Sequence, residues 1–341
     1  MNPKVSAVIT TKNRVQLLQR AVQSALDQTY PLHEIIVVDD ASEDGTQAHC
    51  TALSMERPEI VYIRIEKQHT RGANHARNVG IEAASGQYIA FLDDDDVWLP
   101  EKIAKQIAQL DKHPDCIGAT CFTKWVYIDR KRSYAFVERH SCAQLDKQVF
   151  ERENGAFLYA STGITSALLI DKQALIEAGM FDPALCDHHE TELTFRLRQK
   201  GSFCYVAEPL VVYHLFLNSP GKQISTSAEK ATAAHAYIEQ KHGAHFAQLT
   251  EKQKKDWALC KHTTCFERCA RARSTKQALR YLLAIFKIDK RPQTILRLIP
   301  KCILPYTLYQ RVWCFVAAAR SAADENSCFS ASGSDAASNR S

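Results

Sequence analysis

Residues 86–100, GQYIAFLDDDDVWLP, place a short apolar segment directly before four consecutive aspartates. The apolar run from Ile89 to Leu92 follows Gly86 and ends in acids, which is the pattern of a buried strand. Pro100 suits the first turn of a helix because its fixed φ angle is already helical. The stretch therefore predicts a strand, an acidic turn and a helix in direct succession.

The four aspartates, Asp93 to Asp96, are candidates for holding a divalent cation. Neighbouring carboxylates repel one another, so four of them stay together in a folded protein when something relieves that repulsion. Oxygen ligands suit Mg2+ or Mn2+, and these ions are commonly shared with the phosphates of a substrate. A solvated acidic turn at a helix N-terminus is the alternative interpretation, since carboxylates are favoured there as well.

The first 215 residues alternate apolar strands with amphipathic helices. We expect strands at 5–10, 34–38, 60–65, 88–92, 116–128 and 165–170, a strand pair at 203–212, and helices at 15–28, 46–55, 72–84, 101–110 and 172–178. Such alternation predicts an α/β fold with a mainly parallel sheet flanked by helices, in which ligands bind beyond the carboxyl ends of the strands. Polar clusters follow three of these strands, so we expect one crevice lined by Thr10/Thr11/Asn13, Asp39/Asp40 and Asp93–Asp96.

The composition is that of an ordinary globular protein with a mild positive charge. Of the 341 residues, 45% are apolar and 24% are charged, and the formal net charge is +5. The twelve cysteines contain no Cys-x-x-Cys pair, which favours reduced thiols in a cytosolic protein over a zinc site or a disulfide framework. No apolar run approaches the roughly 18 residues of a membrane span, and the N-terminus carries no apolar signal core.

Five motifs occur in the order seen in family 2 glycosyltransferases, which this chain therefore resembles. They are VITTKNR at 8–14, QTYP at 28–31, EIIVVDDASEDGT at 34–46, ARNVGI at 76–81 and FLDDDDVWLP at 91–100. The resemblance covers roughly residues 4–215. It implies a GT-A fold, an inverting mechanism and a nucleotide-sugar donor, expected to be a UDP-sugar.

The resemblance also implies a donor site at the first two strand ends. Thr10 and Asn13, with the pair Asp39 and Asp40, are expected to contact the base and ribose, with Asp40 at the base. Carboxylates at a strand end can accept hydrogen bonds from such groups, although helix capping is an alternative role for the pair. Arg77 is expected either to bind the diphosphate or to pair with a nearby aspartate.

The family's Asp-x-Asp pattern fits residues 93–95. We expect Asp95 to bind Mn2+ or Mg2+ directly, Asp93 to contact the ribose or a metal-bound water, and Asp94 to contribute to donor binding. The run of identical residues leaves the register ambiguous, and Asp96 is a further acid. His214 is a candidate metal ligand, with a structural role as the alternative. The ion would neutralise charge on the departing nucleoside diphosphate.

Residues 179–198, GMFDPALCDHHETELTFRLR, resemble the family segment that carries the catalytic base. Alignment on Arg196 and Leu197 puts Glu190 where the family has aspartate. Glutamate has a similar proton affinity and one more methylene group. Asp187 is a second candidate base, and the histidines at 188–189 are candidates for the base or for acceptor binding. The alternative is a polar helix cap at 187–190 followed by an exposed Glu192.

Beyond residue 226 the sequence is rich in helix formers, with helices expected at 228–242 and at 250–286, interrupted near Ser274. Residues 268–311 hold eleven Lys or Arg and one acid among apolar residues. This pattern suits an anionic membrane surface, or a helical unit packed on the catalytic domain. Nucleic-acid binding is disfavoured because no recognition motif accompanies the charge. We expect a catalytic domain at 1–225, a basic helical extension at 226–320 and a disordered tail at 321–341.

Together these features predict a metal-dependent inverting hexosyltransferase, and the resemblance implies that it extends a bacterial surface glycan such as lipopolysaccharide or capsule. Its acceptor is expected to be a glycan or lipid-linked glycan, and its location the cytoplasm, peripheral on the inner face of the plasma membrane. A loop at 219–225 is expected to close over the donor. One alternative is a sugar nucleotidyltransferase, although the loop at 10–14 lacks the glycines usual there. A catalytically impaired glycan-binding relative is the other alternative, because His189-Glu190 stands where the family has a Glu-Asp pair.

Overall fold

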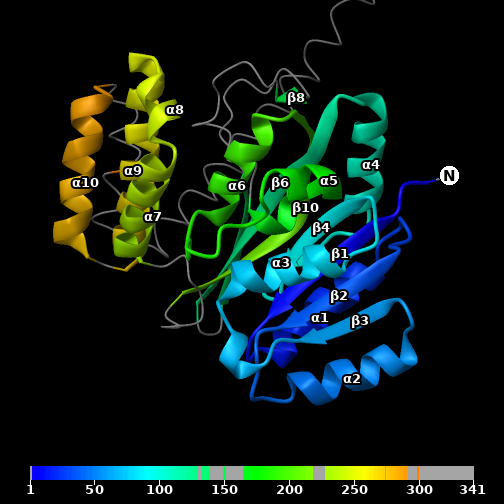
Figure 1. Ribbon diagram of the computed structural model, residues 1–341. Helices are drawn as coiled ribbons and strands as arrows, with labels where there is room; N and C mark the ends of the chain where they lie inside the picture. Colours follow the sequence, from blue (N-terminus) through cyan, green and yellow to red (C-terminus); the bar gives the residue numbers. More distant parts are fainter. Residues whose placement is uncertain are drawn as a thin grey trace, which may run out of the picture.

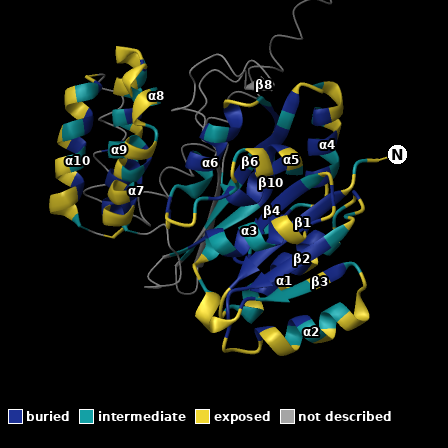
Figure 2. Cartoon of the chain, in the orientation of Figure 1, coloured by how far each residue is buried: buried dark blue, intermediate teal, exposed yellow. Residues whose placement is uncertain are grey.

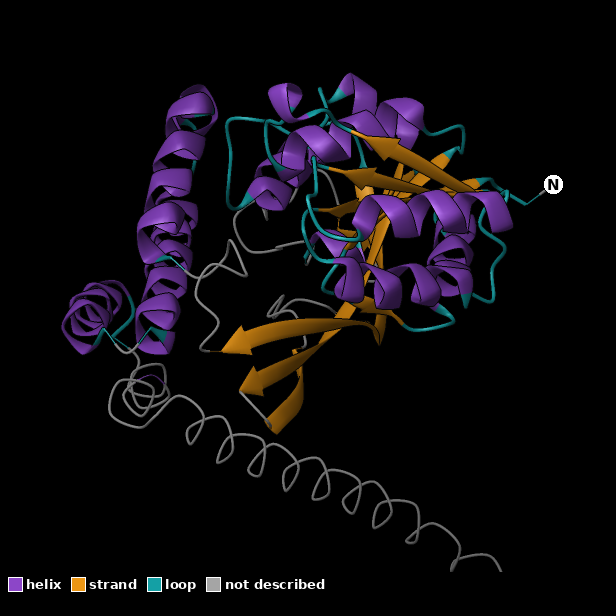
Figure 3. Ribbon diagram, turned by 90° about the horizontal axis from the view of Figure 1, so that it is seen from below, coloured by secondary structure: helices purple, strands orange, loops and turns teal. Residues whose placement is uncertain are grey.

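A mixed, mainly parallel sheet forms the centre of the computed structural model, with helices on both of its faces (Figures 1 and 3). The structure describes residues 2–129, 132–138, 149–150, 164–217, 227–272, 274–290 and 298. The predicted α/β fold with helices at its C-terminal side is thereby confirmed. The expected loop at 219–225 and the tail at 321–341 lie outside the described residues, and the three domain boundaries stay predictions.

The sheet has the strand order β3-β2-β1-β4-β9-β6-β10-β5. Its first four strands are mutually parallel, namely β1 (Val5–Thr11), β2 (Glu34–Asp39), β3 (Ile60–Arg64) and β4 (Tyr88–Asp93). The other half contains the short antiparallel β9 (Leu169–Asp171) and β5 (Val97–Trp98), and the long parallel pair β6 (Cys116–Asp129) and β10 (Ser202–Leu217). β7 (Arg132–Glu138) and β8 (Val149–Phe150) pair with β6 and β10.

Two apolar clusters cover the two faces of the sheet because side chains alternate along each strand. On one face, Val5, Ala7 and Ile9 pack with α1 (Val15–Leu26) and α4 (Lys102–Lys112). On the other face, the cluster includes β1, β2 and β4 and three helices, namely α3 (Ala73–Ala83), α5 (Lys172–Glu177) and α6 (His189–Arg198). The remaining helix of this half, α2 (Thr46–Glu56), packs beside β3.

Helix α3 lies unusually close to the sheet at Gly80. A Cβ atom added there would come 2.4 Å from Cγ1 of Val8 and 3.3 Å from Cγ2 of Val38. Only glycine permits this approach without displacing the strand residues. The close contact places the preceding turn of α3, which carries Asn74 and Arg77, near the carboxyl end of β4.

The C-terminal helices form a separate layer beside α6 (Figure 1). They are α7 (Ala228–Lys241), α8 (Gly243–Ala247), α9 (Glu251–Arg271) and α10 (Thr275–Ile288). A capping box between Thr250 and Gln253 starts α9. One cluster joins α7, α9 and α10 around Phe266, and another packs Leu185, from the loop before α6, against Ala234 and Trp257. None of the helices described is long and apolar enough to cross a membrane.

The sequence-based prediction differs from the structure at two strands. The expected pair at 203–212 is one continuous strand, β10, with register shifts around Pro209. Proline lacks the N–H group of a ladder bond, and the shift accommodates that loss without ending the strand. The strand expected at 165–170 begins as a single 3-10 turn, Thr165–Ala167, before β9.

Candidate active site

Strand register brings the three polar clusters to one edge of the sheet. Thr11 lies opposite Asp39 in the β1–β2 ladder, and Thr10 lies opposite Asp93 in the β1–β4 ladder. The hydroxyls at the end of β1 therefore lie between the acids of β2 and those of β4. This is the edge where ligands bind in parallel α/β sheets.

Asp93, the first acid of the turn after β4, pairs with Arg77 of α3. Nη2 of Arg77 lies 2.6 Å from Oδ1 of Asp93, and Nη1 donates to Oδ1 of Asn74 at 3.0 Å. The Arg77 side chain is 6% exposed and that of Asp93 28%. Of the two expectations for Arg77, pairing with a nearby aspartate is therefore observed, and diphosphate binding stays a prediction.

Asp94 and Asp95 share Arg14, which stands at the start of α1. Its Nη1 lies 2.9 Å from Oδ1 of Asp94 and 3.2 Å from Oδ2 of Asp95. Thr11 also donates to Asp94 at 2.8 Å. Burial lowers the pKa of Arg14, but the two carboxylates outweigh it and the pKa is raised overall. This guanidinium offsets part of the repulsion that the acidic run creates.

Asp96 faces the interior. Its Oδ2 accepts a hydrogen bond of 2.5 Å from Ser166, whose Oγ in turn accepts the backbone N–H of Asp93. Burial, followed by the charges of Asp95 and Asp93, raises the pKa of Asp96 well above its usual value. The structure thus separates the ambiguous acids: Asp96 anchors the turn, whereas Asp93 to Asp95 contact basic or hydroxyl side chains at the sheet edge.

His214, on β10, contacts the same turn. Its Nδ1 lies 2.8 Å from the carbonyl oxygen of Asp95, and a carbonyl only accepts, so Nδ1 carries the hydrogen. Burial lowers the pKa of His214, which favours the neutral ring. Neutral histidine with one nitrogen donating to a carbonyl is the usual state of a metal ligand.

The donor atoms fit a divalent cation that also binds substrate. Carboxylate oxygens and an imidazole nitrogen suit Mn2+, and Mg2+ is commonly held by one or two carboxylates plus phosphates. In the part of the chain that the structure describes, no three His, Cys, Asp or Glu side chains are already gathered as a metal site. Mg2+ in particular usually keeps several waters and takes further oxygens from substrate phosphates.

The two acids after β2 have different surroundings. Asp39 is fully buried and accepts hydrogen bonds from Tyr62, Arg64 and the N–H of Ser42. Oδ2 of Asp40 lies 3.1 Å from Nζ of Lys12. Oδ1 of Asp40 is buried and accepts no hydrogen bond from the described residues. An acceptor left in that state costs about 1–3 kcal/mol, which a ligand donor would recover.

Asn13 ties two loops of this edge together. Its φ of 55° is in the left-handed region, which asparagine tolerates better than most residues. Its backbone N–H donates to Ser42 at 2.8 Å, and its Oδ1 accepts the N–H of Glu43 at 2.6 Å. The side chain therefore shapes the loop after β2, and a direct contact with a donor stays a prediction.

Glu190 lies in the first turn of α6, and its side chain is 20% exposed. Burial raises its pKa to about 7, and among the charges that act on it are Asp187 and Asp93, which raise the pKa, and Arg77, which lowers it. Nε2 of His189 is 3.5 Å from Oε2 of Glu190. A carboxylate with a pKa near neutrality is suited to proton abstraction.

Asp187, the other candidate base, is held by Arg268 of α9. Both side chains are buried, and the two carboxylate oxygens contact the two terminal nitrogens of the guanidinium. Burial alone raises the pKa of Asp187, but Arg268 and His188 lower it below the usual range. Its role as a base stays a prediction, and the ion pair makes it a weaker proton acceptor than Glu190.

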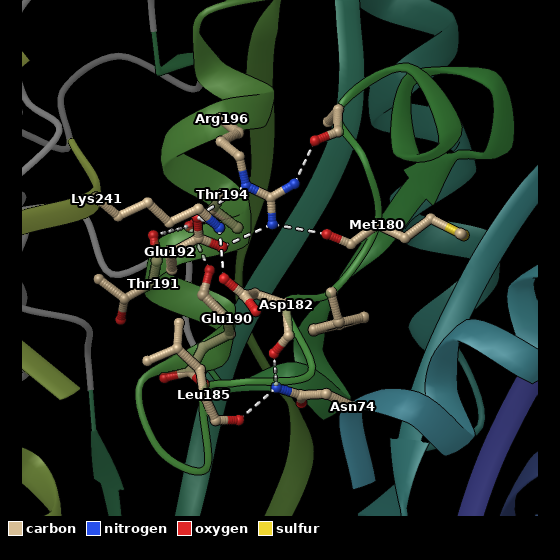
Figure 4. Close-up of polar contacts among 12 residues, drawn as sticks. Asn74, Met180, Asp182, Leu185, Glu190, Thr191, Glu192, Thr194, Arg196 and Lys241 are labelled. Atoms are coloured by element: carbon tan, nitrogen blue, oxygen red, sulfur yellow. Dashed lines mark hydrogen bonds and ion pairs between the residues drawn. The ribbon is translucent and has the colours of Figure 1, made fainter. Parts of the chain in front are cut away.

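Glu192 is not the exposed charge that the helix-cap interpretation expected. Its side chain is fully buried, and it accepts from Arg196 and Lys241 (Figure 4). Nε2 of His242 also lies 2.9 Å from Oε1 of Glu192. Burial alone raises its pKa, but these partners lower it to about 2. Glu192 therefore fastens the first turn of α6 to the end of α7.

Sequence reasoning missed three residues of this site. Arg14 is the last residue of the motif VITTKNR, and its place in that motif was the only sequence signal for it. Ser166 bonds to Asp96 across 70 positions, and Arg268 bonds to Asp187 across 81. Nothing local in the sequence indicates those two contacts.

Comparison with known proteins gives consistent matches. The model described as Glycosyl transferase family 2 matches residues 6–176, half of the chain. "Uncharacterized glycosyltransferase RP339" of Rickettsia prowazekii is 31% identical over 214 residues, which cover 62% of this chain and 63% of that protein. The matched stretch thus spans less than two thirds of that relative.

Two further relatives carry more specific names. The putative teichuronic acid biosynthesis glycosyltransferase TuaG of Bacillus subtilis is 28% identical, covering 70% of this chain and 90% of that protein. WfaP of Escherichia coli, named a UDP-Glc:alpha-D-GlcNAc-diphosphoundecaprenol beta-1,3-glucosyltransferase, is 41% identical over 103 residues, 30% of this chain and 39% of that protein.

Solved structures share the fold. TarS 1-349 of S. aureus with UDP-GlcNAc has a TM-score of 0.58 at 16% identity, over 90% of this chain and 89% of that one. The mannosyltransferase PcManGT of Pyrobaculum calidifontis, with GDP-Man and Mn2+, has a TM-score of 0.54 at 16% identity, over 92% and 83%. These likenesses support the GT-A architecture. With half of its length matched by the family model, the chain belongs to glycosyl transferase family 2.

Proposed function

We propose that the protein transfers a hexosyl residue, with inversion, from a UDP-sugar to a lipid-linked glycan in the assembly of a bacterial surface polysaccharide. The observation that carries this proposal is that the acids after β2 and β4 lie at one sheet edge, and that the charge of Asp93 at this edge acts on Glu190. The names of TuaG and WfaP support the polysaccharide and the lipid-linked acceptor.

The nucleotide base is proposed to bind at Asp40. The buried Oδ1 of Asp40 needs a donor, and the N3–H of uracil is one. Asp39 is fixed behind it by Tyr62 and Arg64, so it would support the loop rather than reach the base. The N1–H of guanine is also a donor, which makes a GDP-sugar the runner-up.

The diphosphate is proposed to bind beside Asp93 to Asp95. Asp95 and His214 would hold Mn2+ or Mg2+, with Asp93 reached through a bound water. When bound, the ion offsets charge on the leaving nucleoside diphosphate. Arg14 and Arg77 already contact these acids and are the cations nearest to the phosphates in this arrangement.

Glu190 is proposed as the general base. Its carboxylate would take the proton of the acceptor hydroxyl as that oxygen bonds to the anomeric carbon and the bond to the diphosphate oxygen breaks. Attack from the face opposite the nucleotide gives inversion. The raised pKa of about 7 suits this role better than the ion-paired Asp187 does.

Helix α10 offers a surface for an anionic membrane, where a lipid-linked acceptor would lie. Its inner face, with Ala278, Leu282 and Ile285, is buried, whereas Leu279, Leu283 and Phe286 are 46%, 63% and 52% exposed (Figure 2). Exposed basic residues lie along one side of this apolar stripe, namely Lys276, Arg280 and Lys287, and Lys290 is exposed just beyond the end of the helix. An apolar stripe beside basic side chains fits the headgroup region of an anionic bilayer.

The function is tested by incubating the full chain and Mn2+ with a panel of nucleotide sugars and a synthetic lipid-diphosphate-linked sugar. Release of UDP together with a lengthened acceptor is expected, and Asp95→Asn should lose both. Glu56→Gln, at an exposed site on α2, is the matched control. Pyrophosphate formation from UTP and a sugar phosphate would instead identify a nucleotidyltransferase, and no reaction with any donor would contradict the proposal.

The membrane contact is tested by sedimentation with phosphatidylglycerol vesicles. Changing Leu279, Leu283 and Phe286 to serine should lower the partition coefficient about 100-fold, because each half-exposed side chain contributes about 1 kcal/mol when buried. Met55→Ser on α2, where the side chain is 81% exposed, is the control. Sedimentation unchanged in the triple variant would reject this surface.

A further inference from the structure

The loop that leads into α6 is fastened by the C-terminal helices. Arg268 of α9 contacts both carboxylate oxygens of Asp187, and its Nη1 donates to the carbonyl of Ser227 at 3.0 Å. Arg268 and Asp187 are each 5% exposed. Since Ser227 is the N-cap of α7, one guanidinium joins the start of α7, the body of α9 and the loop before α6.

Asp187 links Arg268 to the backbone at the start of α6. Its Oδ1 accepts the N–H of His188 at 2.9 Å, and His188 has a φ of 52° at the N-cap of α6. A left-handed conformation costs roughly 1 kcal/mol or more for a residue with a Cβ, so it persists only where its surroundings impose it. The helix begins at the next residue, and Glu190 lies in its first turn.

A second set of contacts acts on the same turn from α7 (Figure 4). Nζ of Lys241 lies 2.9 Å from Oε1 of Glu192 and 2.5 Å from Oδ2 of Asp182. His242 adds a contact to Glu192 at 2.9 Å. Lys241 thus ties both ends of the segment 182–192 to the C-terminal section.

The other side of the loop before α6 is held by Asn74 of α3. Nδ2 of Asn74 donates to the carbonyls of Asp182 at 2.8 Å and Leu185 at 2.6 Å, while its Oδ1 accepts from Arg77. The loop before Glu190 is therefore held between the arginine that pairs with Asp93 and the buried arginine of α9.

We propose that Arg268 is a positioning residue, which keeps the first turn of α6 and the Glu190 carboxylate in the geometry needed for transfer. This inference rests on the proposed function, in which Glu190 is the base. It gives the C-terminal helices a part in catalysis, in addition to any membrane contact. Lys241 is a second positioning residue, acting through Glu192.

The charge of Arg268 should also affect the pH dependence of kcat, which distinguishes a positioning role from a role in stability alone. Burial is the main cause of the raised pKa of Glu190, and the charge of Asp187 raises it further, against the opposing charge of Arg77. Arg268 offsets the charge of Asp187. Its removal should therefore move the acid limb of the kcat profile to higher pH, which a general loss of folded protein would not do.

The test compares the full-length wild type with Arg268→Met and Arg268→Lys, using donor binding by calorimetry and transfer to a water-dispersed acceptor analogue. We expect kcat to fall about 10- to 100-fold in Arg268→Met, as for a catalytic group displaced by about 1 Å. Donor affinity and donor KM should stay within twofold. Arg268→Lys keeps the positive charge but not the planar guanidinium. Its kcat should be reduced, while the acid limb of its pH profile should stay at the wild-type pH. Lys255→Met, exposed on the same helix, is the control.

Wild-type kcat and pH profile in Arg268→Met, with transfer abolished in Glu190→Gln, would overturn the positioning role and leave the proposed function intact. Full activity in Glu190→Gln would instead overturn the proposed function. If Arg268→Met does not fold, Arg268→Lys and Lys241→Met provide the test. The inference predicts a lower kcat with an unchanged donor KM in these variants, and an unchanged kcat in both would reject it.

Discussion

Replacing Glu190 by glutamine removes one proton acceptor and leaves the size of the side chain unchanged. Glu190 lies half-buried in the first turn of α6, with its side chain 20% exposed, and desolvation raises its pKa to about 7. At pH 8 about nine tenths of such a carboxylate is ionised, and at pH 6 about one tenth, from a single-group titration. In the wild type, kcat should therefore fall about tenfold per unit below pH 7.

The size of the loss follows from the role of the group. A positioned general base contributes about 100- to 10,000-fold to rate, so kcat of Glu190→Gln at pH 8 should fall by at least about 100-fold, or about 2.7 kcal/mol in activation free energy. The residual rate should be independent of pH between 6 and 8. Glu190→Asp, one methylene shorter, should retain the pH dependence with an intermediate kcat.

The assay follows UDP release with acceptor present, from pH 5.5 to 8.5, and measures donor affinity separately by calorimetry. Donor affinity should stay within twofold in Glu190→Gln, because the side chain does not belong to the proposed nucleotide or diphosphate contacts. Glu177→Gln, at an exposed site on α5, is the matched control. A Glu190→Gln variant with kcat above a tenth of the wild-type value, or with an unchanged acid limb, would refute the reasoning.

Three further changes test the packing around the site by chemical denaturation. Lys102 is fully buried and its pKa is lowered from 10.5 to about 8, so between pH 8 and 10.5 the unfolded chain binds more protons than the folded one. The free energy of unfolding should therefore rise by up to about 3 kcal/mol across this pH range. Lys102→Met should abolish the rise, and the exposed control Lys112→Met should retain it. Burial lowers the pKa of His188 to about 4 and that of its ring neighbour His235 to about 2, so the unfolded chain binds more protons than the folded one below about pH 6.5. The free energy of unfolding should therefore fall from about pH 6.5 toward 4 by up to about 1.4 kcal/mol per pH unit for each histidine. His235→Phe should reduce this slope, and an unchanged slope would contradict the buried histidine pair. Gly80→Val should destabilise the chain by about 1–3 kcal/mol because α3 must move from β1, and wild-type stability would refute the close packing.

The sequence was informative where function depends on strand ends. Parallel strands must place their carboxyl ends at one edge, so Thr10, Asp39 and Asp93 were brought together by topology alone. The individual partners of each acid were not predictable. Four identical residues do not reveal which of them takes which partner, and Ser166, which donates to Asp96, lies 70 positions further along the chain.

The C-terminal section shows a different limit of sequence reasoning. The basic residues from Arg268 onward suited either a membrane-facing surface or a helical unit packed on the catalytic domain. In the structure Arg268 is buried against Asp187, while Arg280 is exposed on α10. Likewise Leu282 is buried and Leu283 exposed. A run of basic and apolar residues does not reveal which of them face a neighbouring helix, because that depends on contacts between distant parts of the chain.

The central claim is that the acidic turn after β4 binds a divalent ion, which also binds the diphosphate of the donor. Anomalous diffraction at the manganese edge, from crystals grown with MnCl2 and UDP, tests it most directly. The account predicts a peak about 2.1 Å from a carboxylate oxygen of Asp95 and from an oxygen of the diphosphate. UDP bound at this edge with no manganese peak beside Asp95, or a peak at another site, would contradict it.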